Sequence, residues 1–89
     1  MKTILTTPRF ERRLSAFISH HPDLAKLVQR TMQQIAVDSR VANLKTHKLS
    51  GNLRDCYAAR IGYEYRVVFL PTRDSVCFID IGAHDDVYR

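Results

Sequence analysis

The sequence predicts an α+β fold in which two helices form an antiparallel hairpin that packs on one face of a small, mainly antiparallel sheet. Two stretches in the first half, 8–20 and 22–36, carry apolar residues at the spacing of amphipathic helices. Three later stretches, 55–61, 64–70 and 75–81, are rich in β-branched and aromatic residues and are separated by turn sequences. With a short strand at the start, the expected order is strand, helix, helix and three strands.

The first strand and the first helix meet at a clear boundary. Residues 2–6 are predicted as a strand, and Thr7 followed by Pro8 is typical of a helix start, because threonine caps the free N–H groups and proline suits the first turn. The helix is expected to end near His20. Its apolar stripe consists of Phe10, Leu14, Phe17 and Ile18.

The second helix is predicted to begin at Pro22 by the same reasoning, with Asp23 favouring the positive end of the helix dipole. Its apolar stripe consists of Leu24, Leu27, Val28, Met32, Ile35 and Ala36. Two amphipathic helices must cover an apolar surface, and the sheet is the only candidate. The adjacent histidines at the helix junction, His20 and His21, are interpreted as solvent-exposed residues and not as a metal site.

Residues 38–53 show no sustained hydrophobic period and are predicted to form a long loop. This segment contains His47 and three basic residues, Lys45, Lys48 and Arg40. Loops longer than about 12–15 residues in a compact domain are usually functional.

The register of the next hairpin decides where two arginines lie. If its loop has three residues, 62–64, then Arg60 pairs with Arg66 and Ile61 with Tyr65, and both arginines lie on the face opposite the helices. A two-residue loop would put them on different faces; we favour the longer loop. Unpaired arginine is costly to bury, and like charges opposite each other repel. This face is therefore expected to be open to an anionic ligand.

The net charge of +5 predicts an anionic partner, with phosphate the first choice. Residues 1–89 contain no apolar run near the roughly 20 residues needed to span a bilayer, and no signal peptide. We therefore expect a single domain, in the cytoplasm, without a membrane partner. Cys56 and Cys77 fall in apolar strand patterns and are predicted to be buried thiols, with neither a disulfide nor a zinc site.

The candidate site residues suit the cleavage of RNA without a metal or cofactor. Such cleavage needs a base for the ribose 2'-hydroxyl, cations around the phosphate and an acid for the leaving oxygen. His47 and His84 are candidates for the two proton transfers, because histidine titrates near neutral pH. Arg60 and Arg66 are candidates for holding the phosphate, and Tyr88 for stacking on an unpaired base.

Three separated motifs resemble the RelE superfamily of toxin ribonucleases over the whole chain. They are the loop His-Lys-Leu-Ser-Gly at 47–51, the hairpin with Arg-Ile-Gly at 60–62 and Tyr-Arg-Val-Val-Phe at 65–69, and the tail Ile-Gly-Ala-His-Asp-Asp-Val-Tyr at 81–88. The loop and the tail look most like the YafQ branch of this superfamily.

The resemblance implies a toxin of a type II toxin-antitoxin system that cleaves messenger RNA in the ribosomal A site and leaves a 2',3'-cyclic phosphate. It also implies a cognate antitoxin as partner, with any DNA contact made only through that antitoxin. In the YafQ branch, the loop histidine matches His47 and the tail histidine and aromatic match His84 and Tyr88.

The YafQ branch can be compared with this chain at two positions of the central hairpin, Arg60 and Glu64. Arg60 stands where the branch has a histidine, and Glu64 stands at the position of an acid, so the chain differs from the branch at one proton-transfer position. Arg66 matches the phosphate-contacting arginine of RelE itself. Lys45, Lys48 and Arg54 are assigned to RNA binding.

Two other functions are alternatives for this sequence. A ParE-like relative of the same fold would inhibit DNA gyrase and lack the nuclease residues; His47, His84 and Tyr88 argue against this function. A non-catalytic RNA-binding module is compatible with the composition alone.

Overall fold

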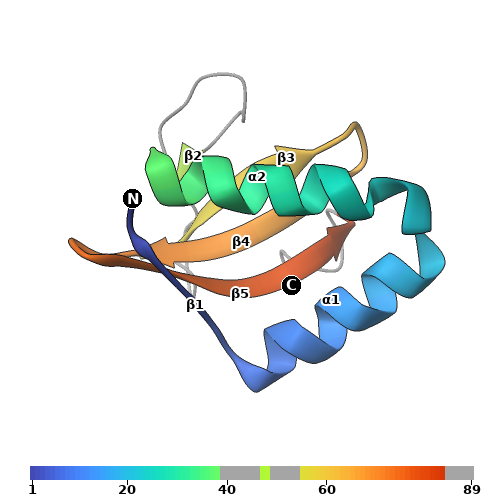
Figure 1. The fold of residues 1–89 in the computed structure, drawn as a ribbon, viewed down its shortest axis with the longest axis horizontal. Coiled ribbons are helices and arrows are strands. Elements are labelled where there is room, and N and C mark those ends of the chain that lie inside the picture. Colours follow the sequence, from blue (N-terminus) through green and yellow to red (C-terminus); the bar gives the residue numbers. More distant parts are fainter. Residues whose placement is uncertain (39–46, 49–54, 84–89) are drawn as a thin grey trace.

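Two α-helices lie on one face of a five-stranded sheet in the computed structural model, which describes residues 1–38, 47–48 and 55–83 (Figure 1). The strand order in the sheet is β1-β5-β4-β3-β2. The β1–β5 pair is parallel, and the other three pairs are antiparallel. The predicted α+β class with a mainly antiparallel sheet is confirmed.

The first strand, β1 (Thr3–Thr6), lies at one edge of the sheet and pairs with residues 75–78 of β5 (Ser75–Ala83). The sequence left the position of this strand in the sheet open. Beyond Phe78, β5 has no strand partner on this side among the described residues, and α1 (Pro8–His20) packs against β5 instead (Figure 1).

The helix α1 has the bounds that the sequence predicts. Thr7 is its N-cap, and the threonine Oγ1 accepts the Phe10 N–H at 3.0 Å. Phe10 and Phe17 are buried against the sheet, as the apolar stripe requires.

The second helical segment begins as a 3-10 turn, η1 (Pro22–Leu24), which continues into α2 (Ala25–Val37). A 3-10 turn is common at a helix end, so the predicted start at Pro22 is correct for the turn but three residues early for the α-helix. Val28, Ile35 and Ala36 are buried on its inner side.

The hairpin of β3 (Tyr57–Ile61) and β4 (Tyr65–Pro71) confirms the predicted register. Its three-residue loop pairs Ile61 with Tyr65 and Arg60 with Arg66. The loop begins with Gly62 at φ 60°, a left-handed conformation that favours glycine.

The prediction that 38–53 is one long loop is wrong for two residues. His47–Lys48 form β2, which pairs with β3 through His47 opposite Ala58 and Lys48 opposite Tyr57. A two-residue strand is too short to show a periodicity, and the unpaired edge of β3 supplies the backbone partners that form it. Residues 39–46 and 49–54 lie outside the described part of the chain.

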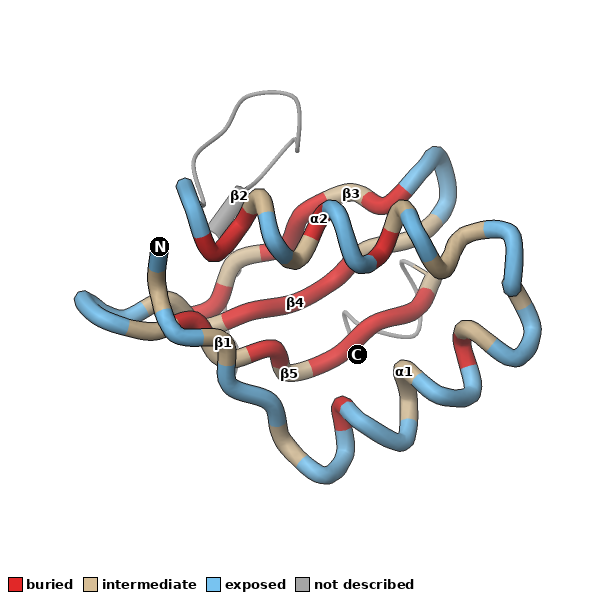
Figure 2. The backbone as a smooth tube through the Cα atoms, in the orientation of Figure 1, coloured by how far each residue is buried: buried red, intermediate tan, exposed pale blue. Residues whose placement is uncertain are grey.

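The core lies between the helices and the inner face of β3, β4 and β5 (Figure 2). Its largest fully buried side chains include Phe10, Phe69, Phe78, Ile35, Ile61 and Ile81. Within the described ranges, no helix is long and apolar enough to cross a membrane.

A β-bulge in β5 moves an acidic residue out of the core. Phe69 pairs with Phe78 and Val68 pairs with Asp80, so Ile79 is the extra residue. If side chains alternated strictly between the two sheet faces after Phe78, Asp80 would point toward the helices. With the bulge, Ile81 points toward the helices instead and is buried in the core. The bulge therefore keeps a carboxylate out of the apolar core.

Asp80 is held by α1. Arg13 Nε donates to its Oδ1, and Arg9 Nη2 lies 3.4 Å from its Oδ2. Arg13 also donates to the carbonyl oxygen of Ile81 at 3.1 Å, which connects α1 to the edge of β5. The Asp80 side chain is 11% exposed, and that of Arg13 is 33% exposed.

We expect Arg13→Ala to lower the free energy of unfolding by about 1–3 kcal/mol, because Asp80 would lose its main partner while staying nearly buried. Urea unfolding followed by circular dichroism would measure the change. Arg12→Ala is the matched control: Arg12 is exposed and forms no ion pair with a described residue, so its effect should stay within about 0.5 kcal/mol. Equal losses in both variants would contradict a structural role for the Arg13–Asp80 pair.

Candidate functional site

Two arginines face each other across the hairpin on the side of the sheet away from the helices. Arg60 of β3 is paired with Arg66 of β4, and both are half-buried. Neither forms an ion pair with any described residue. Each donates a hydrogen bond to a backbone oxygen: Arg60 Nη2 to the Tyr63 carbonyl at 3.4 Å, and Arg66 Nη1 to the Tyr65 carbonyl at 2.9 Å. Most of their hydrogen-bonding capacity is unused in the described structure.

Arg60 also lies beside an exposed aromatic ring. Its guanidinium carbon is 5.3 Å from the ring centroid of Tyr63, which is 85% exposed at the tip of the hairpin. Its Nε is buried and has no hydrogen-bond partner among the described residues. A buried N–H without an acceptor is a ready donor for a ligand oxygen.

The outer sheet face is less open than the sequence predicted. Cys56, Ala58 and Val68 are buried there, with Leu70 and Ile79 packed against them. Small and apolar side chains exclude water from the middle of this face, whereas the two arginines at one end remain half-buried.

Cys56 is buried as predicted, whereas Cys77 is only partly buried and the prediction for it is wrong; both thiols are free. Burial, with smaller contributions from Asp55 and Cys77, raises the pKa of the Cys56 thiol above its ordinary value of 9.0. As the pH rises, the Cys56 thiol therefore loses its proton at a lower pH in the unfolded chain than in the folded protein.

The stability that Cys56 contributes is accordingly present below the ordinary thiol pKa and is lost as the pH rises through the raised value. We expect the parent to lose more unfolding free energy than Cys56→Ala between about pH 8 and about pH 10. Urea unfolding at several pH values would test this, with Cys77→Ala as the matched thiol control. Parallel pH profiles for the parent and Cys56→Ala would contradict the expectation.

The remaining predicted residues divide into three groups. Glu64 is exposed in the same hairpin loop that separates Arg60 from Arg66, so the structure brings these three positions together at one end of the sheet. His47 and Lys48 belong to β2, next to β3, and only their backbone is described. Lys45, Arg54, His84 and Tyr88 lie outside the described residues.

The end of β5 leads toward the arginines. Gly82 is paired with Arg66, and Ala83, the last described residue, is paired with Tyr65. His84 follows directly in the sequence. The last described residues of β5 therefore lie at the same end of the sheet as the arginine pair.

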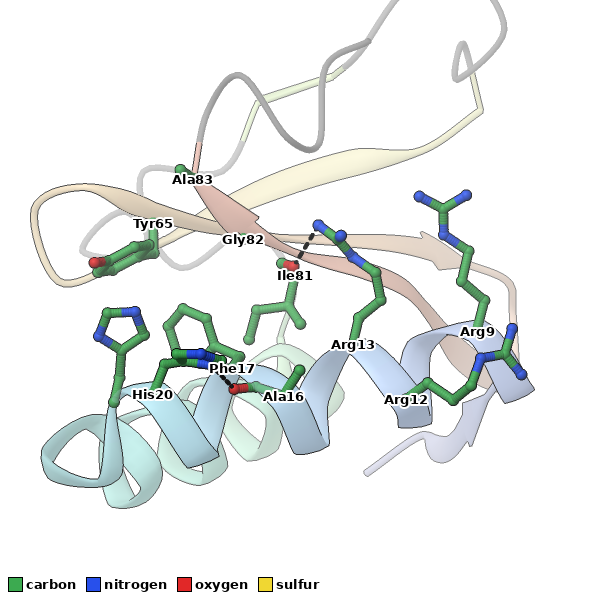
Figure 3. Close-up of a pocket in the computed structure, with 11 residues that line it drawn as sticks. Arg9, Arg12, Arg13, Ala16, Phe17, His20, Tyr65, Ile81, Gly82 and Ala83 are labelled. Atoms are coloured by element: carbon green, nitrogen blue, oxygen red, sulfur yellow. Dashed lines mark hydrogen bonds between the residues drawn. The ribbon is translucent and has the colours of Figure 1, made fainter.

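A basic cleft on the other side of this end was not predicted from the sequence. It has a volume of about 620 Å³ and lies between α1 and the ends of β4 and β5 (Figure 3). Three arginines of α1 line it, together with His20, His21 and Tyr65; the arginines are Arg9, Arg12 and Arg13. The sequence contains a signal for one wall of this cleft, because residues 9, 12, 13, 16 and 20 recur at helical spacing and therefore share one side of the helix.

Three rings form one wall of this cleft. Phe17 and Tyr65 meet edge to face with centroids 5.0 Å apart, and His21 lies 4.8 Å from each of them. His20 is exposed, and its Nδ1 donates to the Ala16 carbonyl oxygen at 2.8 Å. Among the residues that the structure describes, no three side chains of the histidine, cysteine or carboxylate types are grouped to hold a metal ion.

The sequence matches no family model and no curated protein. Several solved structures share the fold. YafQ from E. coli strain BL21(DE3) aligns with a TM-score of 0.86 at 14% identity, over 100% of both chains. A metal-bound toxin from Helicobacter pylori aligns with a TM-score of 0.84 at 23% identity, over 98% of this chain and 99% of that chain.

The toxin of the E. coli DinJ-YafQ toxin-antitoxin complex is also similar, with a TM-score of 0.83 at 16% identity over 99% of this chain and 98% of that chain. These likenesses confirm the RelE-like, YafQ-type fold that the sequence predicted.

Proposed function

We propose that this protein is the toxin of a type II toxin-antitoxin system and acts as a ribosome-dependent endoribonuclease on messenger RNA. The observation that carries the proposal is the Arg60–Arg66 pair, two cations held side by side with no acidic partner among the described residues. Folding alone gains nothing from opposing like charges, whereas a phosphate between two guanidinium groups would be bound by both. The full-length likeness to YafQ supports the same assignment.

The proposed reaction proceeds without a metal or cofactor. A base takes the proton of the ribose 2'-hydroxyl, the 2'-oxygen attacks the adjacent phosphorus, and the bond from phosphorus to the 5'-oxygen breaks. An acid protonates the leaving 5'-oxygen, and the product ends in a 2',3'-cyclic phosphate. The arginines neutralise the charge that develops on the phosphoryl oxygens.

The residue roles follow the sequence, and the hairpin that brings Arg60, Glu64 and Arg66 together supports three of them. His47 and His84 are assigned the two proton transfers, with His84 as the acid. Arg60 and Arg66 hold the phosphate, and Glu64 occupies the family's acidic position beside them.

The remaining contacts are assigned to RNA binding. Tyr88 stacks on a base, and three basic residues hold the backbone: Lys45, Lys48 and Arg54. The same proposal makes residues 1–89 one toxin domain that acts in the cytoplasm.

A cognate antitoxin is the proposed protein partner. Its support is the DinJ-YafQ toxin-antitoxin complex, whose toxin shares this fold. Contact with DNA is assigned to the antitoxin alone.

One experiment separates the candidate functions. The purified protein is added to ribosomes programmed with messenger RNA, and, in parallel, to a gyrase supercoiling assay. We expect message cleavage with 2',3'-cyclic phosphate ends and unchanged supercoiling. Inhibited supercoiling without cleavage would assign the chain to the gyrase-inhibitor class, and RNA binding without either effect would make it a non-catalytic binding module.

A further inference from the structure

We propose that the basic cleft between α1 and the ends of β4 and β5 binds the phosphate backbone of single-stranded RNA, as a second contact outside the reaction site. The inference rests on the proposed function only in taking RNA as the ligand. The cleft has a volume of about 620 Å³, and described residues line it on the α1 side and on the β4 and β5 side (Figure 3).

The charge of the cleft favours an anion. Among the described residues, its lining contains three arginines, Arg9, Arg12 and Arg13, and no carboxylate. Asp80 neutralises Arg13 and lies within 3.4 Å of Arg9, but the Arg9 side chain remains 64% exposed. Arg12 is exposed and forms no ion pair among the described residues. At least one guanidinium group is therefore free to bind a phosphate in a bidentate manner.

The arrangement of these cations favours an extended chain over a single ion. The lining residues of α1 run from Arg9 to His20 along one side of the helix, with Ala16 between them. Eleven residues of α-helix rise by about 16 Å. This length accommodates more than one phosphate of an extended strand, and the small Ala16 side chain leaves room beside it.

The opposite wall favours nucleic acid over a simple polyanion. It includes the half-buried Tyr65 together with Gly82 and Ala83 of β5. The imidazole of His21, at the end of α1, lies 4.8 Å from the Tyr65 ring. Aromatic rings next to guanidinium groups are the usual components of sites for single-stranded nucleic acid, where bases stack while the backbone is held by charge.

The position of the cleft connects it to the reaction site. Gly82 lines the cleft and is paired with Arg66. Ala83 also lines the cleft and is paired with Tyr65, so the cleft and the arginine pair adjoin the same end of β5. One RNA strand can therefore contact both sites.

The test measures the affinity of the full chain for an oligonucleotide of roughly 12 nucleotides with 2'-O-methyl riboses, which cannot undergo attack by the 2'-hydroxyl. Titrations run from about 50 to about 200 mM salt. The variants are Arg12→Gln and Arg9→Gln/Arg12→Gln. The matched controls, Arg30→Gln and Lys26→Gln/Arg30→Gln, remove the same charge from exposed positions on α2. A duplex of the same sequence is a second ligand, and the cognate antitoxin is a third.

We expect the single cleft variant to bind the single strand about 3-fold more weakly and the double variant about 10- to 30-fold more weakly, with the salt slope reduced by about 0.7 for each lost contact. The α2 controls should stay within about 2-fold of the parent. Equal losses in the cleft and control variants would overturn the proposal, since net charge alone would explain them. A loss confined to duplex RNA, or to antitoxin binding, would also overturn it.

The failure of this inference is distinguishable from a failure of the proposed function. If the parent cleaves ribosome-bound message while cleft and control variants bind RNA equally, the cleft assignment is wrong and the nuclease assignment stands. If cleft variants alone lose RNA affinity but the parent cleaves nothing, the cleft binds RNA and the nuclease assignment is wrong.

Discussion

Replacing His84 with alanine is expected to lower the rate of ribosome-dependent cleavage by about 10²- to 10⁴-fold, the usual effect of removing a positioned general acid. The reason lies in the end of β5. Gly82 is paired with Arg66, so the strand leads the chain to the arginine pair just before His84. Single-turnover cleavage of programmed ribosomes measures the effect.

The His84→Ala protein should fold and bind its antitoxin like the parent, because the core contacts of β5 come from residues that precede Gly82. Thermal unfolding and calorimetric titration with the antitoxin are the controls. If the variant cleaves at more than about a tenth of the parent rate, the proton donor lies elsewhere. His47 and Tyr88 would then be the next residues to substitute.

Local signals explain why α1 and the central hairpin were predicted correctly. Thr7 and Pro8 define the start of α1 within one turn, and the observed N-cap bond to Phe10 is the interaction that this pair predicts. The hairpin register depends on loop length, and Gly62 in the left-handed conformation allows the three-residue loop. In both cases the deciding interaction lies within a few residues of chain.

Features that depend on distant partners were not predictable in the same way. The strand β2 exists only as a partner for the edge of β3, and two residues carry no periodic signal of their own. The bulge at Ile79 follows from a conflict between strict alternation and an acidic residue at Asp80. Its resolution depends on Arg13, 67 residues away in the sequence.

The candidate site shows the same division. Arg60, Glu64 and Arg66 lie within one hairpin, so their proximity could be predicted once the loop length was chosen. The basic cleft could not be predicted in this way. The apolar stripe of α1 predicts that its arginines face solvent, but it does not show which part of the sheet lies opposite them. The packing of α1 against the edge of β5 turns this exposed side of the helix into one wall of a cleft.

Replacing Arg66 with alanine is expected to reduce cleavage by about 10²- to 10³-fold, the effect of removing one group that stabilises developing charge in the transition state. The melting temperature should change little. Arg66 is half-buried but forms no ion pair with a described residue, so its removal leaves no buried charge without its partner. Its removal also relieves the repulsion from Arg60, the paired residue on β3.

Two further variants separate charge from geometry in this experiment. Arg66→Lys keeps the cation but loses the fork that binds two phosphate oxygens, so it should recover only part of the rate. Arg73→Ala removes an exposed arginine from the β4–β5 turn and should leave cleavage at the parent level. A collapsed melting temperature in Arg66→Ala would instead make Arg66 a structural residue. Full activity in Arg66→Lys would mean that a point charge is enough and that the bidentate phosphate contact is not required.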